Sequence, residues 1–298
     1  MSFDKKKMVG SVAAGLMRRM QRWLEGKSPA QVEKAGARFG RILMRLGKRR
    51  RATAMSNLLL AFPDMPEGER SRITTATFEH FGICTADFLS SGTWTQAYLD
   101  ETTKIEGDEH IVEALAKGKG AIVVTGHFGN WERVSLWSGY HGYKLHVVVR
   151  TANDEGVDKL VNDLRGRTGT GVIPRGNATR TILQKLRDNE IVAIVPDQNS
   201  DEVFIPFFGK PAGTVLGPGV LHERTGAPVI PVSCLRTGVG TYHIIVHPPL
   251  IPQPGYDIKG EGLMRSLNDW LEGAIRQNPE QWLWFHDRWR NAKERGLI

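Results

Sequence analysis

Cysteine is scarce in this sequence, and the two that occur, Cys84 and Cys234, lie 150 positions apart. This spacing fits neither a metal-binding nor a redox motif, and it excludes a secreted scaffold stapled by disulfides. We therefore expect a reducing, cytoplasmic environment. Hydrophobic residues make up 40% of the chain and charged residues 24%, which excludes a disordered, collagen-like or coiled-coil protein.

Motifs of several enzyme classes are missing as well. Nucleotide chemistry has no support, because the sequence contains neither Gly-x-Gly-x-x-Gly nor Gly-x4-Gly-Lys-Ser/Thr. It contains no His-Glu-x-x-His pair of zinc ligands and no Gly-x-Ser-x-Gly nucleophile elbow. We therefore expect no metal ion, no cofactor and no covalent intermediate on a serine.

No hydrophobic run is long enough to cross a membrane. The longest one near the start, residues 8–17, has ten residues and is followed at once by Arg18 and Arg19, whereas a spanning helix needs about 20. A signal peptide fits in outline, but these arginines stand where a small-residue cleavage site is required. We prefer a helix that lies on a membrane surface, since apolar residues recur beside the arginines at helical spacing: Val9, Val12, Leu16, Met20 and Trp23 or Leu24. The alternative is a helix that packs on the rest of the protein.

Positive charge is concentrated at the N-terminal end. Residues 1–60 hold 15 Lys and Arg against 3 Asp and Glu, a net charge of +12, whereas residues 61–298 hold 25 against 29. A basic end on a slightly acidic body is typical of electrostatic docking to a membrane surface, a nucleic acid or an acidic protein. The run 48–51 belongs to this basic part, although a charge run is more commonly a solvated helix surface. The basic residues lack interleaved aromatics that stack on bases, so we expect an anionic membrane surface and no nucleic acid.

Helical patterns dominate the first third of the chain, and strands and helices alternate after residue 108. An amphipathic helix is expected over 29–47 with Ser28 as its N-cap, and Asp64 and Glu67 resemble a capping box before a helix over 66–91. Apolar runs predict strands at 121–125, 145–149, 191–195, 229–234 and 242–246. Further helices are expected at 108–117, 130–140, 155–167, 177–187, 215–224, 262–277 and 279–290.

This alternation predicts an α/β fold, with a largely parallel central sheet flanked by helices and an N-terminal helical extension. We expect residues 1–27 to form a basic amphipathic segment that associates with a membrane. Residues 28–298 are expected to form a single α/β domain, in which 28–107 are the helical part and 108–298 the catalytic core.

The segment 121–132, AIVVTGHFGNWE, places polar side chains directly after a buried strand. His127 follows the strand end, where open α/β sheets bind their ligands, and Glu132 lies in the first turn of the next helix. Gly126 and Gly129 permit a sharp turn, so the carboxylate of Glu132 is within reach of the imidazole. A carboxylate at Nδ1 would leave the other nitrogen free to take a proton from a hydroxyl. The alternative is a histidine at a helix start and a glutamate that complements the helix dipole.

The pair His127-x4-Glu132 after an apolar strand resembles motif I of the glycerolipid acyltransferase superfamily. The fuller string TGHFGNWE, residues 125–132, resembles the lipid A biosynthesis (late) acyltransferase family. Four further strings follow that family in order: VPDQ (195–198), VFIPFFGKPA (203–212), TGAPVIP (225–231) and NPEQWLWFHDRW (278–289). The resemblance covers most of the chain.

This resemblance implies acyl transfer from a thioester, carried by acyl carrier protein or as acyl-CoA, to a hydroxyl of a lipid A precursor or related glycolipid. His127 would be the general base and Glu132 would orient it, without a covalent acyl-enzyme. Location at the cytoplasmic face of the inner membrane, peripheral or weakly anchored through the N-terminus, is implied as well. Alternatives are a different acceptor, such as a phosphatidylinositol mannoside-like glycolipid or a lysophospholipid, and a non-catalytic protein that binds anionic lipid or nucleic acid.

Several other residues are candidates for binding substrate or supporting the oxyanion. Arg150 follows the expected strand 145–149, and Arg175 follows the residues VIP at 172–174. Both would supply a cation, or they are surface arginines. Asp197 and Gln198 would bind the acceptor, or they cap a loop. The remaining candidates are Asn130 at the expected helix start and the aromatic stretch with Phe207, Phe208 and Gly209, which would line an acyl-chain slot or pack in the core.

Overall fold

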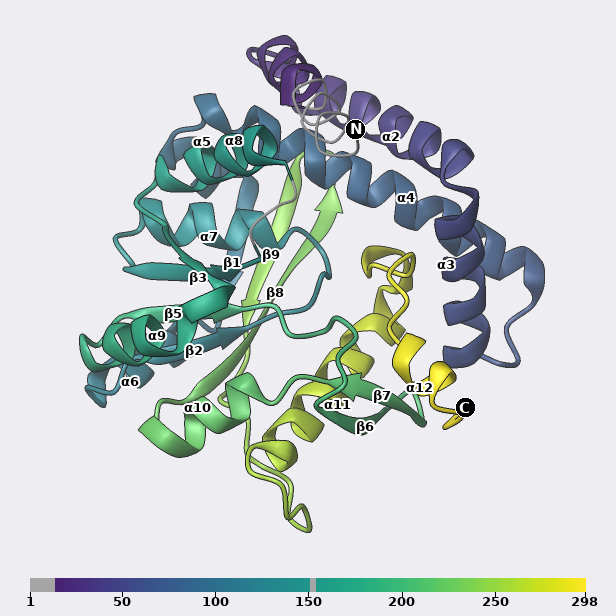
Figure 1. Ribbon diagram of the computed structural model, residues 1–298. Helices are drawn as coiled ribbons and strands as arrows, with labels where there is room; N and C mark the ends of the chain where they lie inside the picture. Colours follow the sequence, from purple (N-terminus) through teal and green to yellow (C-terminus); the bar gives the residue numbers. More distant parts are fainter. Residues whose placement is uncertain (1–13, 151–153) are drawn as a thin grey trace, which may run out of the picture.

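A computed structural model describes residues 14–150 and 154–298. A seven-stranded sheet forms its centre, with the strand order β1-β9-β8-β2-β5-β3-β4 (Figure 1). All neighbouring strands run parallel except β8 and β9, which pair antiparallel. The predicted α/β fold with a mostly parallel sheet and an N-terminal helical region is confirmed.

The sheet strands are β1 (Thr103–Glu106), β2 (Ala121–Val124), β3 (Leu145–Val149), β4 (Gly171–Pro174), β5 (Ile191–Ile194), β8 (Val229–Gly238) and β9 (Thr241–Val246). Two more, β6 (Val203–Phe207) and β7 (Lys210–Thr214), form a separate antiparallel hairpin. The sheet is packed on both faces, and successive side chains of a strand contribute to opposite faces. In β2, Ala121 and Val123 belong to one core cluster and Ile122 and Val124 to the other.

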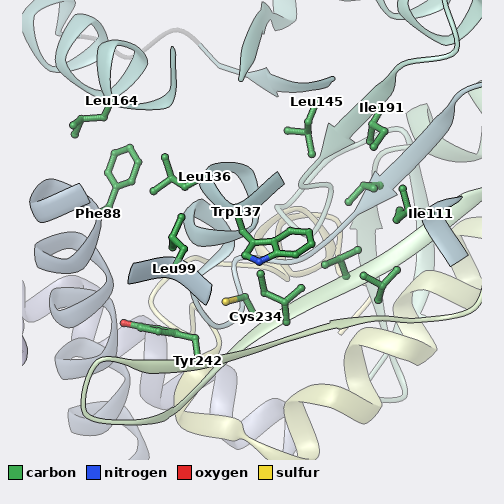
Figure 2. Close-up of a cluster of buried hydrophobic side chains, with 14 of the residues drawn as sticks. Phe88, Leu99, Ile111, Leu136, Trp137, Leu145, Leu164, Ile191, Cys234 and Tyr242 are labelled. Atoms are coloured by element: carbon green, nitrogen blue, oxygen red, sulfur yellow. The ribbon is translucent and has the colours of Figure 1, made fainter. Parts of the chain in front are cut away.

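Helices cover both faces of the sheet (Figure 1). One face carries α5 (Gln96–Thr102), α6 (Glu109–Ala116), α7 (Trp131–Tyr140) and α8 (Glu155–Gly166). Figure 2 shows the cluster on this face, where Trp137 of α7 lies among aliphatic side chains of the strands. The other face carries α9 (Ala178–Arg187), α10 (Gly217–Thr225) and α11 (Glu261–Gln277).

The N-terminal helical part consists of α2 (Pro29–Leu46), α3 (Lys48–Ala61) and α4 (Glu67–Ser90), and α2 and α4 lie side by side (Figure 1). Ser28 caps α2 through a reciprocal capping box with Gln31, as its position predicted. The predicted capping box of Asp64 and Glu67 is wrong, because Pro66 occupies the N-cap position of α4 and no side chain caps it. The basic run 48–51 is the exposed first turn of α3.

Residues 14–24 form a helix that lies against this body. Its Ala14 and Leu24 are buried and Met20 is partly buried against the core, so this side packs on the protein. Leu16 and Trp23 remain 64% and 56% exposed beside the exposed Arg18, Arg19 and Arg22. Val9 and Val12 lie outside the described residues. Among the described helices, none is long and apolar enough to span a membrane.

The end of the chain departs from the expected helix over 279–290. It contains a short 3-10 turn (Pro279–Gln281), irregular backbone and the short helix α12 (Arg290–Glu294). Two backbone hydrogen bonds join this segment to the chain after β2. Gly129 N donates to Gln281 O at 2.8 Å, and Leu283 N donates to His127 O at 3.1 Å. Trp282, Trp284 and Trp289 are buried in a third core cluster.

Candidate active site

His127 lies at the carboxyl end of β2, on a backbone held from two sides. The C-terminal segment binds residues 127–129, and Asn130 N donates to Cys234 O of β8 at 2.8 Å. Gly129 makes this close approach possible, since it has φ +62° and a Cβ there would lie 2.0 Å from Cys234 O. Only glycine fits such a position. The loop that carries the histidine is therefore fixed by the neighbouring strand and by the end of the chain.

Asp197 is the carboxylate that binds His127. Because β5 is the parallel neighbour of β2, the residues after both strands meet at one edge of the sheet. His127 Nδ1 lies 2.7 Å from Asp197 Oδ1, and His127 N donates to Asp197 Oδ2 at 2.7 Å. Trp282 Nε1 donates to the same Oδ2 at 3.0 Å. Asp197 is only 4% exposed, and both of its oxygens are occupied.

The two partners shift each other's protonation. Burial alone lowers the pKa of His127, but the charge and hydrogen bond of Asp197, with a smaller contribution from the charge of Glu132, raise that pKa above its ordinary value. Burial alone raises the pKa of Asp197, but the charge and hydrogen bonds of His127 and the hydrogen bond from Trp282 lower it to about 2. Asp197 is thus ionised at neutral pH, and it holds the imidazole with Nδ1–H directed at the carboxylate.

The second ring nitrogen of His127 faces the accessible side of the site. The side chain is 21% exposed, and Nε2 lies 3.4 Å from Nε2 of Gln198, an exposed residue. The ring of Trp131 packs edge-on against the imidazole at a centroid distance of 5.0 Å. Since Nδ1 carries the proton, Nε2 offers its lone pair at the surface and can accept a proton from a group that arrives beside Gln198.

Glu132 does not make the contact expected of it. Its carboxylate pairs with Arg165 of α8, with Arg165 Nε donating to Oε2 at 2.9 Å, and Trp131 Nε1 donates to Oε1 at 3.2 Å. The physical reason is the direction of α7, whose first turn presents Glu132 to α8 rather than back to the imidazole. Glu132 affects His127 through its charge and through the ring of Trp131, and Asp197 takes the position at Nδ1.

Asn130 points into the protein instead of toward a substrate. It is 1% exposed, its Oδ1 accepts the N-cap bond from Arg133 N, and its Nδ2 donates to Asp87 Oδ2 at 2.8 Å. Asp87 also binds Arg133, whose guanidinium lies between the rings of Trp94 and Tyr242 at 4.6 and 4.3 Å. This buried network fixes the start of α7. One indication of this network was present in the sequence, since Asp87 and Arg133 are charged residues within helices that otherwise face the core.

The remaining candidates form two groups. One group belongs to the core and the β6–β7 hairpin, and the other lies at the sheet edge that carries His127. Phe207 and Phe208 are 0% and 6% exposed and pack against Trp282, Trp284 and Trp289, so packing is the observed outcome, and Gly209 forms the turn between β6 and β7 with φ +69°. Arg150 and Arg175 are exposed and follow β3 and β4 at the same edge as His127. β3 is two strands from β2 and β4 is three, about 10 and 14 Å away.

The C-terminal residues His286 and Arg288 join this segment to the domain. His286 Nε2 accepts a hydrogen bond from Asn199 N at 3.0 Å, and Arg288 donates to Thr214 Oγ1 at 2.9 Å. Asn199 follows Gln198 directly, so the bond from His286 helps to hold the loop after β5. In the two described ranges, no cluster of three His, Cys, Asp or Glu side chains suits a metal ion.

Comparison with known proteins gives one family. The profile of the bacterial lipid A biosynthesis acyltransferases matches residues 26–291. The chain is 28% identical over 278 residues to a lipid A biosynthesis lauroyltransferase of Escherichia coli (strain K12), covering 91% of this chain and 90% of that protein. It is 26% identical over 260 residues to a palmitoleoyltransferase of lipid A biosynthesis from the same strain, covering 86% and 83%. A phosphatidylinositol mannoside acyltransferase of Mycobacterium tuberculosis (strain CDC 1551 / Oshkosh) is 27% identical over 191 residues, covering 62% and 59%.

Proposed function

Because the chain belongs to the bacterial lipid A biosynthesis acyltransferase family, we propose that it moves a fatty acyl chain from a thioester to a hydroxyl of a lipid A precursor or a related glycolipid. Acyl transfer as such belongs to the family and to the named relatives. The observation that carries the proposal is the imidazole of His127, bound at Nδ1 by Asp197 and open at Nε2. The donor is acyl carrier protein or acyl-CoA.

The reaction needs one base and one proton shuttle, and His127 supplies both. Nε2 takes the proton of the acceptor hydroxyl as its oxygen attacks the thioester carbonyl carbon. The tetrahedral intermediate then collapses, the C–S bond breaks, and the imidazolium returns the proton to the departing sulfur. Asp197 stabilises the imidazolium that forms between these steps, as in other His–carboxylate pairs. An ester and a free thiol result, and no acyl-enzyme is formed.

The residues at the same sheet edge are assigned supporting roles. Gln198, beside Nε2, is placed to contact the acceptor where its hydroxyl arrives. Arg150 stands two strands away, so its long side chain can reach toward a carbonyl held over the strand between them. Arg175 on the outermost strand lies farther out and is assigned to more distant parts of a substrate.

A phosphatidylinositol mannoside-like glycolipid is the second candidate acceptor. The match to the mycobacterial acyltransferase named above supports it, although that match covers less of the chain than the lipid A acyltransferases do. Both acceptors present a sugar-bearing lipid with a free hydroxyl. The chemistry at His127 is the same for either one, so the acceptor has to be identified directly.

Mass spectrometry of the product tests the function. The purified protein is incubated with palmitoyl-acyl carrier protein or lauroyl-acyl carrier protein and, separately, with a lipid A precursor, a phosphatidylinositol mannoside or a lysophospholipid. We expect an acceptor whose mass rises by one acyl group, and an equal amount of free thiol. If no acceptor gains mass while the protein binds anionic vesicles, the non-catalytic alternative takes the place of this proposal.

We propose peripheral attachment to the cytoplasmic face of the inner membrane through the basic N-terminal part. The exposed Leu16 and Trp23 with their neighbouring arginines support this, as does the net charge of +12 over residues 1–60. Binding to vesicles that contain phosphatidylglycerol is expected to weaken strongly between 50 and 500 mM NaCl, since the Debye length falls from about 14 to about 4 Å. Sedimentation of the protein with such vesicles measures this, with neutral phosphatidylcholine vesicles as the control. Binding that ignores salt would contradict an electrostatic attachment.

A further inference from the structure

A groove of about 380 Å³ lies at the corner between α2, α3 and α4. Its lining is apolar apart from Arg50 and Thr85, and it consists of Leu43, Leu46, Gly47, Arg50, Phe78, Phe81, Gly82, Thr85 and Phe285. Its volume falls within the range of about 300–1,000 Å³ typical of ligand pockets. Apart from Phe285 in the string 278–289, its residues lie outside the motifs of the sequence, because they come from the three helices.

Glycines bring the helices that form the groove into contact. A Cβ on Gly40 of α2 would lie 2.0 Å from Phe78 O, and one on Gly82 of α4 would lie 2.2 Å from Gly36 O. The two backbones therefore touch at this crossing, where any side chain would force them apart. The salt bridge from Arg41 to Glu79 lies next to the crossing, at 2.7 Å. This rigid pair of helices fixes the floor and one rim of the groove.

A row of aromatic rings connects the groove to the catalytic histidine. Phe78 stacks on Phe285 at a centroid distance of 4.6 Å, and Phe285 contacts Phe81 at 5.4 Å. Phe81 contacts Trp131 at 5.8 Å, and Trp131 packs against His127 at 5.0 Å. The inner end of the groove is thus one tryptophan ring away from the imidazole.

The outer end of the groove opens on a surface that is both apolar and basic. Ile42 and Leu46 are 51% and 78% exposed, and the exposed run 48–51 begins directly after Gly47. Within residues 14–150 and 154–298, no salt bridge uses Arg50. Exposed leucine and isoleucine beside unpaired arginines suit the boundary of an anionic membrane, where apolar chains and negative headgroups meet.

We propose that this groove holds an acyl chain of the lipid acceptor while its hydroxyl is at His127. The chain runs from Trp131 along Phe81, Phe285 and Phe78 and leaves at Leu46, so that the acceptor reaches the histidine without leaving the membrane entirely. The basic run 48–51 binds the anionic headgroups around it. The proposal rests on the acyl transfer proposed above and adds the part of the site that recognises lipid.

Photocrosslinking tests the occupant without requiring turnover. The probe is an anionic glycolipid, a lipid A precursor with a diazirine in one acyl chain, presented in phosphatidylglycerol vesicles to the full-length His127→Ala protein. We expect crosslinks in the peptides that contain Leu46, Phe78 and Phe285. Crosslinks elsewhere, or none above the level seen with a diazirine-bearing alkane, overturn the proposal. If the wild-type protein crosslinks in the groove but acylates no acceptor, the assignment of the groove stands and the proposed function fails.

Kinetics in detergent separate the groove from general membrane binding. Leu46→Glu places a charge at the rim of the groove. The measured quantity is kcat/KM for a long-chain acceptor divided by kcat/KM for the same acceptor with butyryl chains. We expect Leu46→Glu to lower this ratio by about tenfold. Leu59→Glu is the matched control, since Leu59 lies on α3, is 48% exposed and does not line the groove. Equal ratios in wild type and Leu46→Glu overturn the proposal. A change that follows the donor chain length instead would assign the groove to the donor and also overturn it.

Discussion

Replacing His127 with alanine is expected to lower acyl transfer by about 10²–10⁴, the usual contribution of a positioned acid–base group. The loss should be this large because the neighbouring carboxylate offers no substitute. Asp197 is only 4% exposed, and in the variant its Oδ2 still accepts hydrogen bonds from the backbone N of residue 127 and from Trp282 Nε1, so its carboxylate stays held inside the protein. Initial rates with an acyl-acyl carrier protein and a glycolipid acceptor measure the loss, and circular dichroism with the thermal midpoint verifies folding.

His146 provides the matched control for this substitution. It also binds a carboxylate, with Nε2 at 2.7 Å from Glu190 Oε2, and its side chain is 16% exposed. His146 lies near the start of β3, however, and so at the opposite edge of the sheet from His127. We expect His146→Ala to keep most of the activity. Turnover close to that of the wild type in a folded His127→Ala protein would contradict the assignment of the base.

The strands that consist of continuous, buried apolar residues could be predicted from the sequence. AIVV of β2 and IVAI of β5 are apolar throughout, and central parallel strands require this because helices cover both of their faces. The edge strands β1, TKIE, and β4, GVIP, were missed, since four residues with exposed positions carry no detectable period. The hairpin β6–β7 was missed because Pro206 and Pro211 lie opposite each other within it, and proline is a signal against strands.

The site was predictable as far as local sequence determines it. His127 follows a buried strand, and that position alone indicates a ligand site. Its partner was assigned to Glu132 because five residues separate them, whereas Asp197 is 70 positions away. The pairing of β2 with β5 brings Asp197 there, and strand order cannot be determined from the sequence of either strand. A carboxylate directly after a second buried strand was the available signal.

Replacing Asp197 with asparagine is expected to lower kcat by about 10²–10⁴ although the side chain keeps its shape. In the wild type, Oδ2 accepts from His127 N and from Trp282 Nε1, and Oδ1 accepts from Nδ1–H. The amide oxygen of asparagine will stay with the two fixed donors, which leaves its NH2 group facing Nδ1. The imidazole must then carry its proton on Nε2, so the nitrogen that should accept the proton of the acceptor is already protonated. Nitrogen-15 chemical shifts of His127 measure this change of tautomer.

The pH profile of activity distinguishes a role of the Asp197 charge in catalysis from a purely structural role of this residue. The base works as neutral imidazole, so activity falls as the pH drops through the pKa of His127. Asp197 raises that pKa, which places the acidic limb of kcat/KM above the ordinary histidine value of about 6.5. Without the charge, in Asp197→Asn, the limb of the residual activity should move to lower pH. A variant that only loosened the loop would lower the rate and leave the limb where it was.

Comparison with Glu132→Gln decides whether Asp197 or Glu132 is the carboxylate that works with His127. Glu132 is 15% exposed and pairs with Arg165, so the amide should weaken that pair and lower the free energy of unfolding by about 1–3 kcal/mol. Its effect on the rate should be smaller than that of Asp197→Asn. Asp197→Asn should add little to His127→Ala, because residues that act as one unit lose their function together. If Glu132→Gln proves as severe as His127→Ala and adds nothing to it, the histidine works with Glu132 after all, and Asp197 serves only to hold the loop.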